Sequence, residues 1–173
     1  MISRRWILRT GGGLTAALLF GPRTARAADP IEIVMGGRPD GSHVWFDPVG
    51  LHIDPGQTVR WINRDAGNSH TATAYHPDNF GRPRRIPSAA NPWDSDYLLP
   101  GESFSITLTK PGVYDYYCVP HEHAGMVGRI IVGSPEAPGW TNEPLSDGDL
   151  PEAALRAFPT VAEIISKGLV RRA

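Results

Sequence analysis

One short segment of the chain carries three side chains that commonly bind metal ions. Cys118, His121 and Met126 follow one another at the spacings Cys-x-x-His and His-x4-Met, and a further histidine, His70, lies far upstream at the start of a predicted strand. A copper ion that alternates between Cu(I) and Cu(II) favours one thiolate and two imidazoles in a plane, with a weak axial thioether. The segment and His70 therefore predict a copper site of the blue-copper type.

Each of these residues taken alone has a simpler explanation. A lone cysteine is most often a buried structural residue, a methionine is most often core filling, and a single histidine more often lies on the surface. A free thiol in an oxidising compartment, however, is open to oxidation or mispairing unless it is buried or ligated. The spacing of the three residues, Pro120 between two of them and the export signal described below together favour copper.

The cysteine count excludes several other kinds of site. Cys118 is the only cysteine among 173 residues. An internal disulfide, a four-cysteine zinc site, an iron–sulfur cluster held by cysteines alone and the binuclear copper site of terminal oxidases are therefore excluded. No Ser/His/Asp order, phosphate-binding glycine loop or pair of catalytic carboxylates stands out either, so the sequence does not predict an enzyme.

The first 27 residues have the features of an export signal. Ser3-Arg4-Arg5-Trp6-Ile7-Leu8 precedes a short apolar run, Gly11 to Phe20, and Ala25-Arg26-Ala27 is a small-x-small cleavage site. The run is too short to span a bilayer, and its flanks are typical of a signal peptide. The adjacent arginines resemble a twin-arginine signal, which indicates export of the folded protein to the periplasm or another extracytoplasmic space. A basic, disordered start on a cytosolic protein is the alternative.

Cleavage after Ala27 changes the charge of the protein. The whole chain has 17 basic and 18 acidic side chains, for a formal net charge of −1. The first 27 residues hold five arginines and no acidic residue, so the remaining 146 residues have 12 basic and 18 acidic side chains and a net charge of −6. Such an acidic surface argues against a nucleic-acid partner. No transmembrane segment is expected in the mature chain, and we expect a monomer.

Residues 28–133 are expected to form an all-β domain. Short β-branched or aromatic runs alternate with Pro and Gly turns, which favours a two-sheet sandwich or small barrel. Val59 and Trp61 are predicted to share one buried face, and Phe104, Ile106 and Leu108 another. The predicted strands are residues 31–35, 44–46, 50–53, 58–63, 70–75, 103–108, 113–118 and 129–132.

Two further segments break this pattern. Residues 76–100 contain five prolines and the cluster Arg82, Arg84 and Arg85, and are predicted to form either a partner-binding loop or a solvated surface loop. Residues 134–173 are predicted to form a Pro-rich linker followed by two short helices. The first has Pro151 in its first turn, and the second opens at the capping box Thr160-x-x-Glu163 and extends through Leu169. These helices either pack on the sandwich or dock a partner.

The residues around the copper motif are similar to those of a known family. Lys110-Pro111-Gly112-Val113-Tyr114-Asp115-Tyr116-Tyr117-Cys118 and the Cys-x-x-His-x4-Met motif resemble the plastocyanin/pseudoazurin branch of the cupredoxins. The segment from Asp47-Pro48 through Trp61-x-Asn63 to His70 is similar to the first half of such domains. The resemblance covers about residues 30–133, and the helices that follow are similar to those of pseudoazurin.

The resemblance implies a Greek-key β-sandwich that binds one type 1 copper ion and carries single electrons between larger redox proteins. It implies that His70, Cys118 and His121 are equatorial ligands and that Met126 is the axial ligand. Four protein ligands leave no position for a substrate, so outer-sphere electron transfer is expected. Members of the family often have an Asn directly after the first histidine, which ties the two ligand loops together; this chain has Thr71 there.

The sequence also predicts where redox partners dock and where the remaining histidines lie. Redox partners are expected to dock transiently around His121, on a small apolar patch comprising Pro120, Ala124, Gly125 and Val127, with steering by the acidic surface or the arginine-bearing loop. His76 and His123 are expected at the surface near the copper, although some of His43, His52, His76 and His123 could form a second metal site. The alternative function is copper binding or delivery without electron transfer, but the chain has only three methionines.

Overall fold

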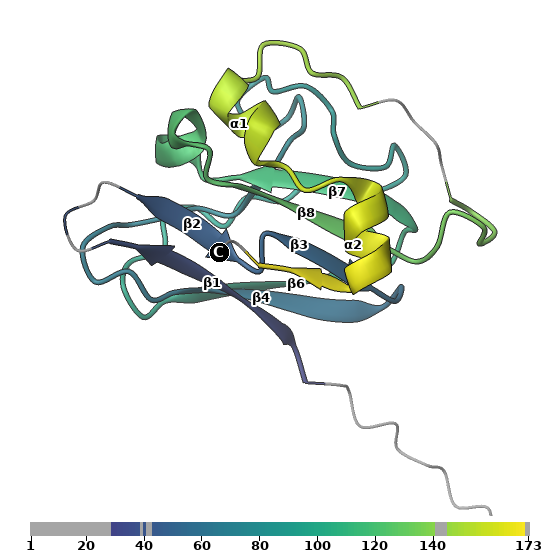
Figure 1. Cartoon of the computed structure of the whole chain (residues 1–173), viewed down its shortest axis with the longest axis horizontal. Coiled ribbons are helices and arrows are strands. Elements are labelled where there is room, and N and C mark those ends of the chain that lie inside the picture. Colours follow the sequence, from purple (N-terminus) through teal and green to yellow (C-terminus); the bar gives the residue numbers. More distant parts are fainter. Residues whose placement is uncertain (1–28, 39, 41–42, 141–144, 172–173) are drawn as a thin grey trace, which may run out of the picture.

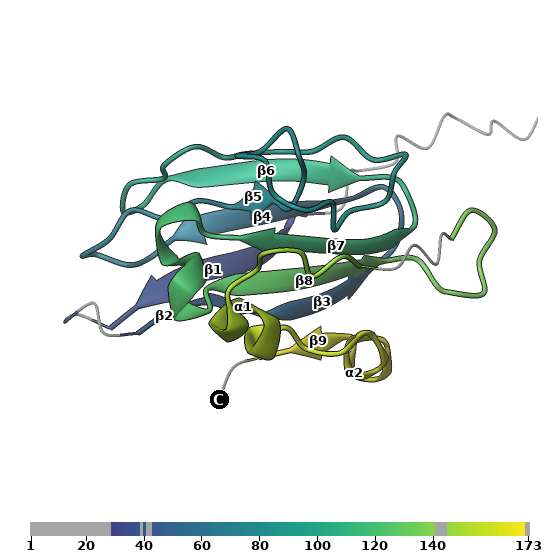
Figure 2. The same cartoon turned by 90° about the horizontal axis from the view of Figure 1, so that it is seen from above.

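Two β-sheets packed face to face make up most of the molecule. The computed structural model describes residues 29–38, 40, 43–140 and 145–171. The short helices near the C-terminus lie on the outer side of one sheet (Figure 1 and Figure 2). This arrangement confirms the predicted β-sandwich with short C-terminal helices. The proposed export signal, residues 1–27, lies outside the described residues.

The first sheet has the strand order β2-β1-β4-β6. Strands β1 and β4 run parallel, and the other neighbours are antiparallel. All four strands fall within two residues of the predicted runs. Their bounds are β1 Ile31–Gly37, β2 Val44–Asp47, β4 Gln57–Asn63 and β6 Ser103–Leu108.

The second sheet has the order β5-β7-β8-β3-β9 and carries the predicted copper loop between β7 and β8. Strands β3 and β8 are parallel, and the other pairs are antiparallel. Their bounds are β3 Gly50–Ile53, β5 Thr73–Ala74, β7 Gly112–Tyr117, β8 Val127–Val132 and β9 Leu169–Val170.

The space between the sheets is filled by side chains from both. Val59 and Trp61 of β4 are fully buried, as predicted, and the Trp61 ring meets that of Tyr116 edge-on with centroids 5.2 Å apart. In β6, Leu108 is buried, but Phe104 and Ile106 are only partly buried, because β6 is the outermost strand of its sheet. Such aromatic contacts between the two sheets stabilise their packing.

The tail folds as two helices and a final strand. Helix α1 spans Glu152–Ala157 and α2 spans Val161–Lys167, where the Thr160 hydroxyl accepts a hydrogen bond from the Glu163 N–H at 3.1 Å. The predicted continuation of this helix through Leu169 is wrong. Gly168 ends α2, because its φ of +71° lies outside the range that a right-handed helix requires. Leu169 and Val170 then pair with β3 as β9, extending the second sheet.

The segment 70–75 is mostly not the strand that the sequence predicts. Only Thr73–Ala74 is a strand, and His70 forms a single bridge with Leu98. The loop 76–100 folds back along this segment, so that the Ala74 N–H donates to the Trp93 carbonyl at 2.9 Å. Trp93 itself is buried. The loop therefore fixes His70 in place from outside the sheet.

Candidate metal centre

Three of the four predicted ligand side chains meet at one point. The Nδ1 atoms of His70 and His121 are 3.2 Å apart, and Cys118 Sγ lies 3.6 Å from the first and 3.4 Å from the second. Among the described residues, these three form the one group of at least three His, Cys, Asp or Glu side chains with ligand atoms within 4.8 Å of one another. His70 and the loop are far apart in the sequence, and the fold of the sandwich brings them together.

The loop that carries the other predicted ligands is tightly folded. Cys118 directly follows β7, and the 3-10 helix η1, Val119–Ala124, contains His121. The Cys118 N–H donates to the Met126 carbonyl at 3.0 Å, and the Met126 N–H donates to the His121 carbonyl at 3.1 Å. Gly125 ends η1 with φ +76°, a conformation that glycine adopts without strain. Met126 is fully buried at the end of this loop.

The donor set fits a copper ion. An ion equidistant from the corners of a triangle with these sides lies about 2 Å from each, which matches metal–imidazole bond lengths and is close to metal–thiolate ones. Burial lowers the pKa of both His70 and His121, so their rings are neutral and can donate a lone pair. Burial raises the pKa of the Cys118 thiol to about 11, so metal binding must displace its proton.

Only one of the three converging side chains reaches the surface. His70 and Cys118 have no exposed area, whereas His121 is partly exposed. His121 is therefore the side chain through which these three residues meet the solvent.

The side-chain hydroxyl of Thr71 connects the segment around His70 with the loop 118–126. The Thr71 hydroxyl accepts a hydrogen bond from the Val119 N–H at 2.9 Å, and the Thr71 N–H donates to Cys118 Sγ at 3.3 Å. Thr73 donates to Asp94 at 2.7 Å, which leaves its oxygen free to accept from Thr71 at 2.8 Å. Thr71 thus makes the connection for which the resemblance to the family led us to expect an Asn.

We expect Thr71→Val to destabilise the protein by about 1–3 kcal/mol, because the Val119 N–H loses its partner at the site. Valine keeps the shape of threonine, so packing changes little. Chemical denaturation of the copper-free protein measures the effect. Thr107→Val is the matched control, because its hydroxyl pairs with Thr58 on the exposed face of the sheet. Equal stability losses in the two variants would contradict the role of Thr71.

The remaining histidines do not assemble a second site in the described part of the chain. His43 stacks on Trp45 with ring centroids 5.3 Å apart, and His52 Nε2 contacts the Gly133 carbonyl at 2.7 Å. His123 is exposed, as predicted. The prediction that His76 is a surface group is wrong: it is 5% exposed. The loop returns to this segment at Arg85, whose N–H donates to the Tyr75 carbonyl at 2.9 Å, and His76 Nδ1 accepts the Asp78 N–H at 3.1 Å.

His76 is expected to make stability fall on acidification. Its pKa is lowered, first by burial and then by Arg84, and only partly restored by Asp78. A histidine with a lowered folded-state pKa binds more protons when unfolded, so stability is full above the unfolded pKa of 6.5 and is lost as pH falls below it. The melting temperature of the His76→Gln variant should therefore fall less than that of the wild type as the pH is lowered from about 7 to about 5. Parallel curves for the two proteins would contradict this.

The predicted docking patch is only partly exposed. Pro120 and Ala124 are exposed beside His121, but Gly125 and Val127 are buried. Helix α1 covers them: a side chain at Gly125 would lie 3.0 Å from the Ala153 carbonyl oxygen. The sequence could not show this, because it left open whether the tail packs on the sandwich.

Buried charges around the site escaped the sequence prediction. Asp115, which is fully buried in β7, is paired with Arg85 at 2.8 Å and Arg129 at 2.7 Å. Next to His121, Glu122 accepts hydrogen bonds from the Tyr75 hydroxyl, at 2.8 Å, and from Arg82. Two of the three clustered arginines, Arg82 and Arg85, thus pair with buried carboxylates, and Arg84 is the exposed member of the cluster. A signal was present for Asp115, which is a single acidic residue within the apolar and aromatic run 113–117.

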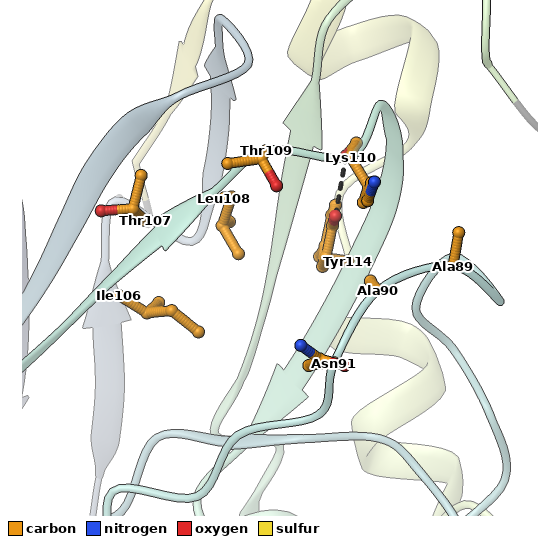
Figure 3. Close-up of a pocket in the computed structure, with 9 residues that line it drawn as sticks. All are labelled: Ala89, Ala90, Asn91, Ile106, Thr107, Leu108, Thr109, Lys110 and Tyr114. Atoms are coloured by element: carbon orange, nitrogen blue, oxygen red, sulfur yellow. Dashed lines mark hydrogen bonds between the residues drawn. The ribbon is translucent and has the colours of Figure 1, made fainter.

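A pocket of about 260 Å³ lies away from this centre (Figure 3). It lies at the start of β7, where the Tyr114 hydroxyl donates to the Lys110 carbonyl at 2.7 Å, whereas Cys118 follows the strand's other end. Its lining comprises Ala89, Ala90, Asn91, residues 106–110 and Tyr114. None of these is a His, Cys, Asp or Glu, so the pocket does not fit a metal ion.

Comparisons with known proteins agree with this geometry. A family model described as copper binding proteins, plastocyanin/azurin family, matches residues 33–133. Plastocyanin from Sambucus nigra is 38% identical over 104 residues, covering 59% of this chain and 99% of that protein. Plastocyanin from Chlamydomonas reinhardtii is 43% identical over 94 residues, covering 54% and 61%. A pseudoazurin structure from Sinorhizobium has a TM-score of 0.54 and 28% identity, covering 79% and 98%. The fold and the resemblance expected from the sequence are confirmed.

Proposed function

Because the chain belongs to the plastocyanin/azurin family of copper-binding proteins, whose members carry electrons, we propose that it transfers single electrons between redox partner proteins. Its cofactor is one type 1 copper ion. His70, Cys118, His121 and Met126 would hold this ion. The close approach of two imidazole nitrogens and one thiol sulfur, at 3.2 to 3.6 Å, is the observation that carries this proposal.

The protein holds one donor geometry through both oxidation states. The copper, when bound, supplies the one-electron chemistry. The chain fixes the donors through Thr71, which ties the two ligand loops, and through the backbone hydrogen bonds of the loop 118–126. Burial of His70 and Cys118 keeps water away. A site with four protein ligands leaves no place for a substrate, so the proposed reaction is outer-sphere electron transfer and not catalysis.

Partners dock transiently where the His121 ring reaches the surface. The exposed neighbours Pro120, His123 and Ala124 form the centre of this contact, and helix α1 bounds it on one side. A small contact of this kind suits rapid exchange of partners. The net charge of −6 after cleavage steers the encounter, and nucleic acid is not a partner. The protein acts as a monomer.

The segments of the chain have separate tasks. Residues 1–27 direct export through a twin-arginine signal, residues 28–133 form the copper domain, and residues 134–173 form the linker and helical extension. The mature protein works in the periplasm or another extracytoplasmic space. In the part of the chain that the structure describes, no helix is both long and apolar enough to cross a bilayer.

Repeated reduction and reoxidation of the copper-loaded protein tests the proposal. An electron carrier is expected to keep its copper over many cycles in the presence of a competing Cu(I) chelator, because all four ligands stay in place. The visible spectrum after each reoxidation measures the retained copper. Loss of copper to the chelator on the first reduction would instead support the alternative, a copper-delivery protein.

A further inference from the structure

A buried carboxylate lies directly behind one of the proposed copper ligands. Asp65 is 3% exposed, and its Oδ2 accepts a hydrogen bond from His70 Nε2 at 3.0 Å. The opposite nitrogen of the same ring, Nδ1, faces Cys118 and His121. One imidazole therefore separates the Asp65 carboxylate from the metal centre.

Neighbouring groups hold this carboxylate firmly. Its Oδ1 accepts the Gly67 N–H at 2.9 Å, and its Oδ2 also accepts from the Asn68 side chain at 2.8 Å. The Asp65 N–H donates to the Asn63 side chain at 2.9 Å, and Asn63 in turn donates to the Leu98 carbonyl at 2.8 Å. The carboxylate is thus fixed between the end of β4 and loop 76–100.

A glycine makes room for the carboxylate. A Cβ atom at Gly37, the last residue of β1, would lie 1.9 Å from Asp65 Oδ2. Any other residue at this position would push the carboxylate away from His70. The close approach of β1 to Asp65 therefore depends on the absence of a side chain.

The carboxylate accepts hydrogen bonds on both oxygens. The Gly67 N–H, the Asn68 amide and His70 Nε2 all approach it, and such contacts stabilise the ionised form. An ionised carboxylate only accepts hydrogen bonds, so Nε2 of His70 carries the ring proton and Nδ1 keeps its lone pair.

We propose that Asp65 is a positioning residue that fixes the tautomer of His70 and lowers the reduction potential of the copper site. The inference rests on the proposed function, because it takes His70 as a ligand. A carboxylate behind a ligand imidazole makes the ring a stronger donor. A fixed negative charge in a buried environment also stabilises the doubly charged Cu(II) more than the singly charged Cu(I).

Asp65→Asn in the full mature chain tests this, because Asn keeps the shape and removes the charge. Losing such a partner typically weakens metal binding about 10–100-fold. We expect Cu(II) affinity to fall about tenfold more than Cu(I) affinity, which raises the reduction potential by about 59 mV. Asp54→Asn is the control: it removes the same charge from an exposed turn at the other end of β4, and should leave the potential unchanged.

Two further variants separate positioning from a purely structural role. Asn68→Ala removes one hydrogen bond to Asp65 and should lower stability while leaving the potential near wild type. Gly37→Ala should raise the reduction potential, because it displaces the Asp65 carboxylate. This variant tests the same role of Asp65 if Asp65→Asn does not fold. In the copper-free protein, ¹⁵N NMR should show His70 protonated at Nε2 in wild type and a mixture of tautomers in Asp65→Asn.

The outcomes distinguish this inference from the proposed function. A wild-type protein that is intensely coloured and cycles its copper, with an unchanged potential in Asp65→Asn and Gly37→Ala, would overturn the role of Asp65 alone. A wild-type protein without an intense visible band would overturn the ligand set, whatever the potential does. A rise in potential only in the Asp65→Asn and Gly37→Ala variants supports the inference.

Discussion

Replacing Cys118 by serine is expected to abolish the intense visible absorption of the Cu(II) protein. The band arises from charge transfer between a thiolate and copper, and Cys118 is the only thiol in the chain. Its Sγ lies 3.4 Å and 3.6 Å from the two imidazole nitrogens, and the chain has no second thiol to take its place. A serine hydroxyl is a harder donor that keeps its proton at neutral pH, so any Cu(II) that still binds should be pale.

The absorption spectrum and the copper content per chain are measured together. His123→Gln is the matched control, because His123 lies two residues from His121 but is exposed, and this variant should keep the full band. The Thr71 N–H can donate to a serine oxygen as it does to the sulfur, so the fold should survive. An intense band in Cys118→Ser would refute the type 1 site, as would its loss in His123→Gln.

Replacing Asp115 by alanine is expected to cost about 3–5 kcal/mol of stability, because two buried cations lose their common partner. Arg85 and Arg129 are 3% and 8% exposed, and both guanidinium groups also stack on the Phe158 ring, at 5.1 Å and 4.9 Å. Without the Asp115 carboxylate the two buried cations repel each other, although Arg85 keeps an ion pair with the exposed Asp147 at 2.9 Å. The repulsion should also release the tail, since Arg129 holds the Pro159 carbonyl and Arg85 the Ser146 carbonyl, each at 2.9 Å.

Chemical denaturation of the copper-free protein gives the loss, and limited proteolysis reports whether residues 145–171 detach. Glu152→Ala is the control: Glu152 pairs with Arg156 on the exposed face of α1, where such a pair contributes about 0.3–0.5 kcal/mol. If Asp115→Ala lost no more stability than Glu152→Ala, the buried ion pairs would not be what fastens the tail.

The local patterns in the chain predicted much of the sandwich. Alternation and turn residues placed β1, β4, β6 and β7 to within two residues, because a strand with one buried face repeats every second residue. The same reasoning failed for 70–75, where an isolated bridge to Leu98 and the folded loop 76–100 replace a regular strand. The same reasoning also extended the last helix past Gly168. In the structure Leu169 and Val170 pair with β3 instead, and a local pattern cannot show that the edge of β3 is available for pairing.

The sequence by itself determined the chemistry of the centre: one thiol, a histidine three residues later and a methionine at fixed spacing, since ligand type and loop length are local properties. Only the tertiary structure decided what surrounds them. Asp65 lies only five residues before His70, yet its contact with the ring depends on how the chain between them folds. Asp115 between two arginines and α1 over Gly125 are contacts between segments distant in the chain. Spacing carries no information on such contacts, because they depend on how the sheets and the tail pack.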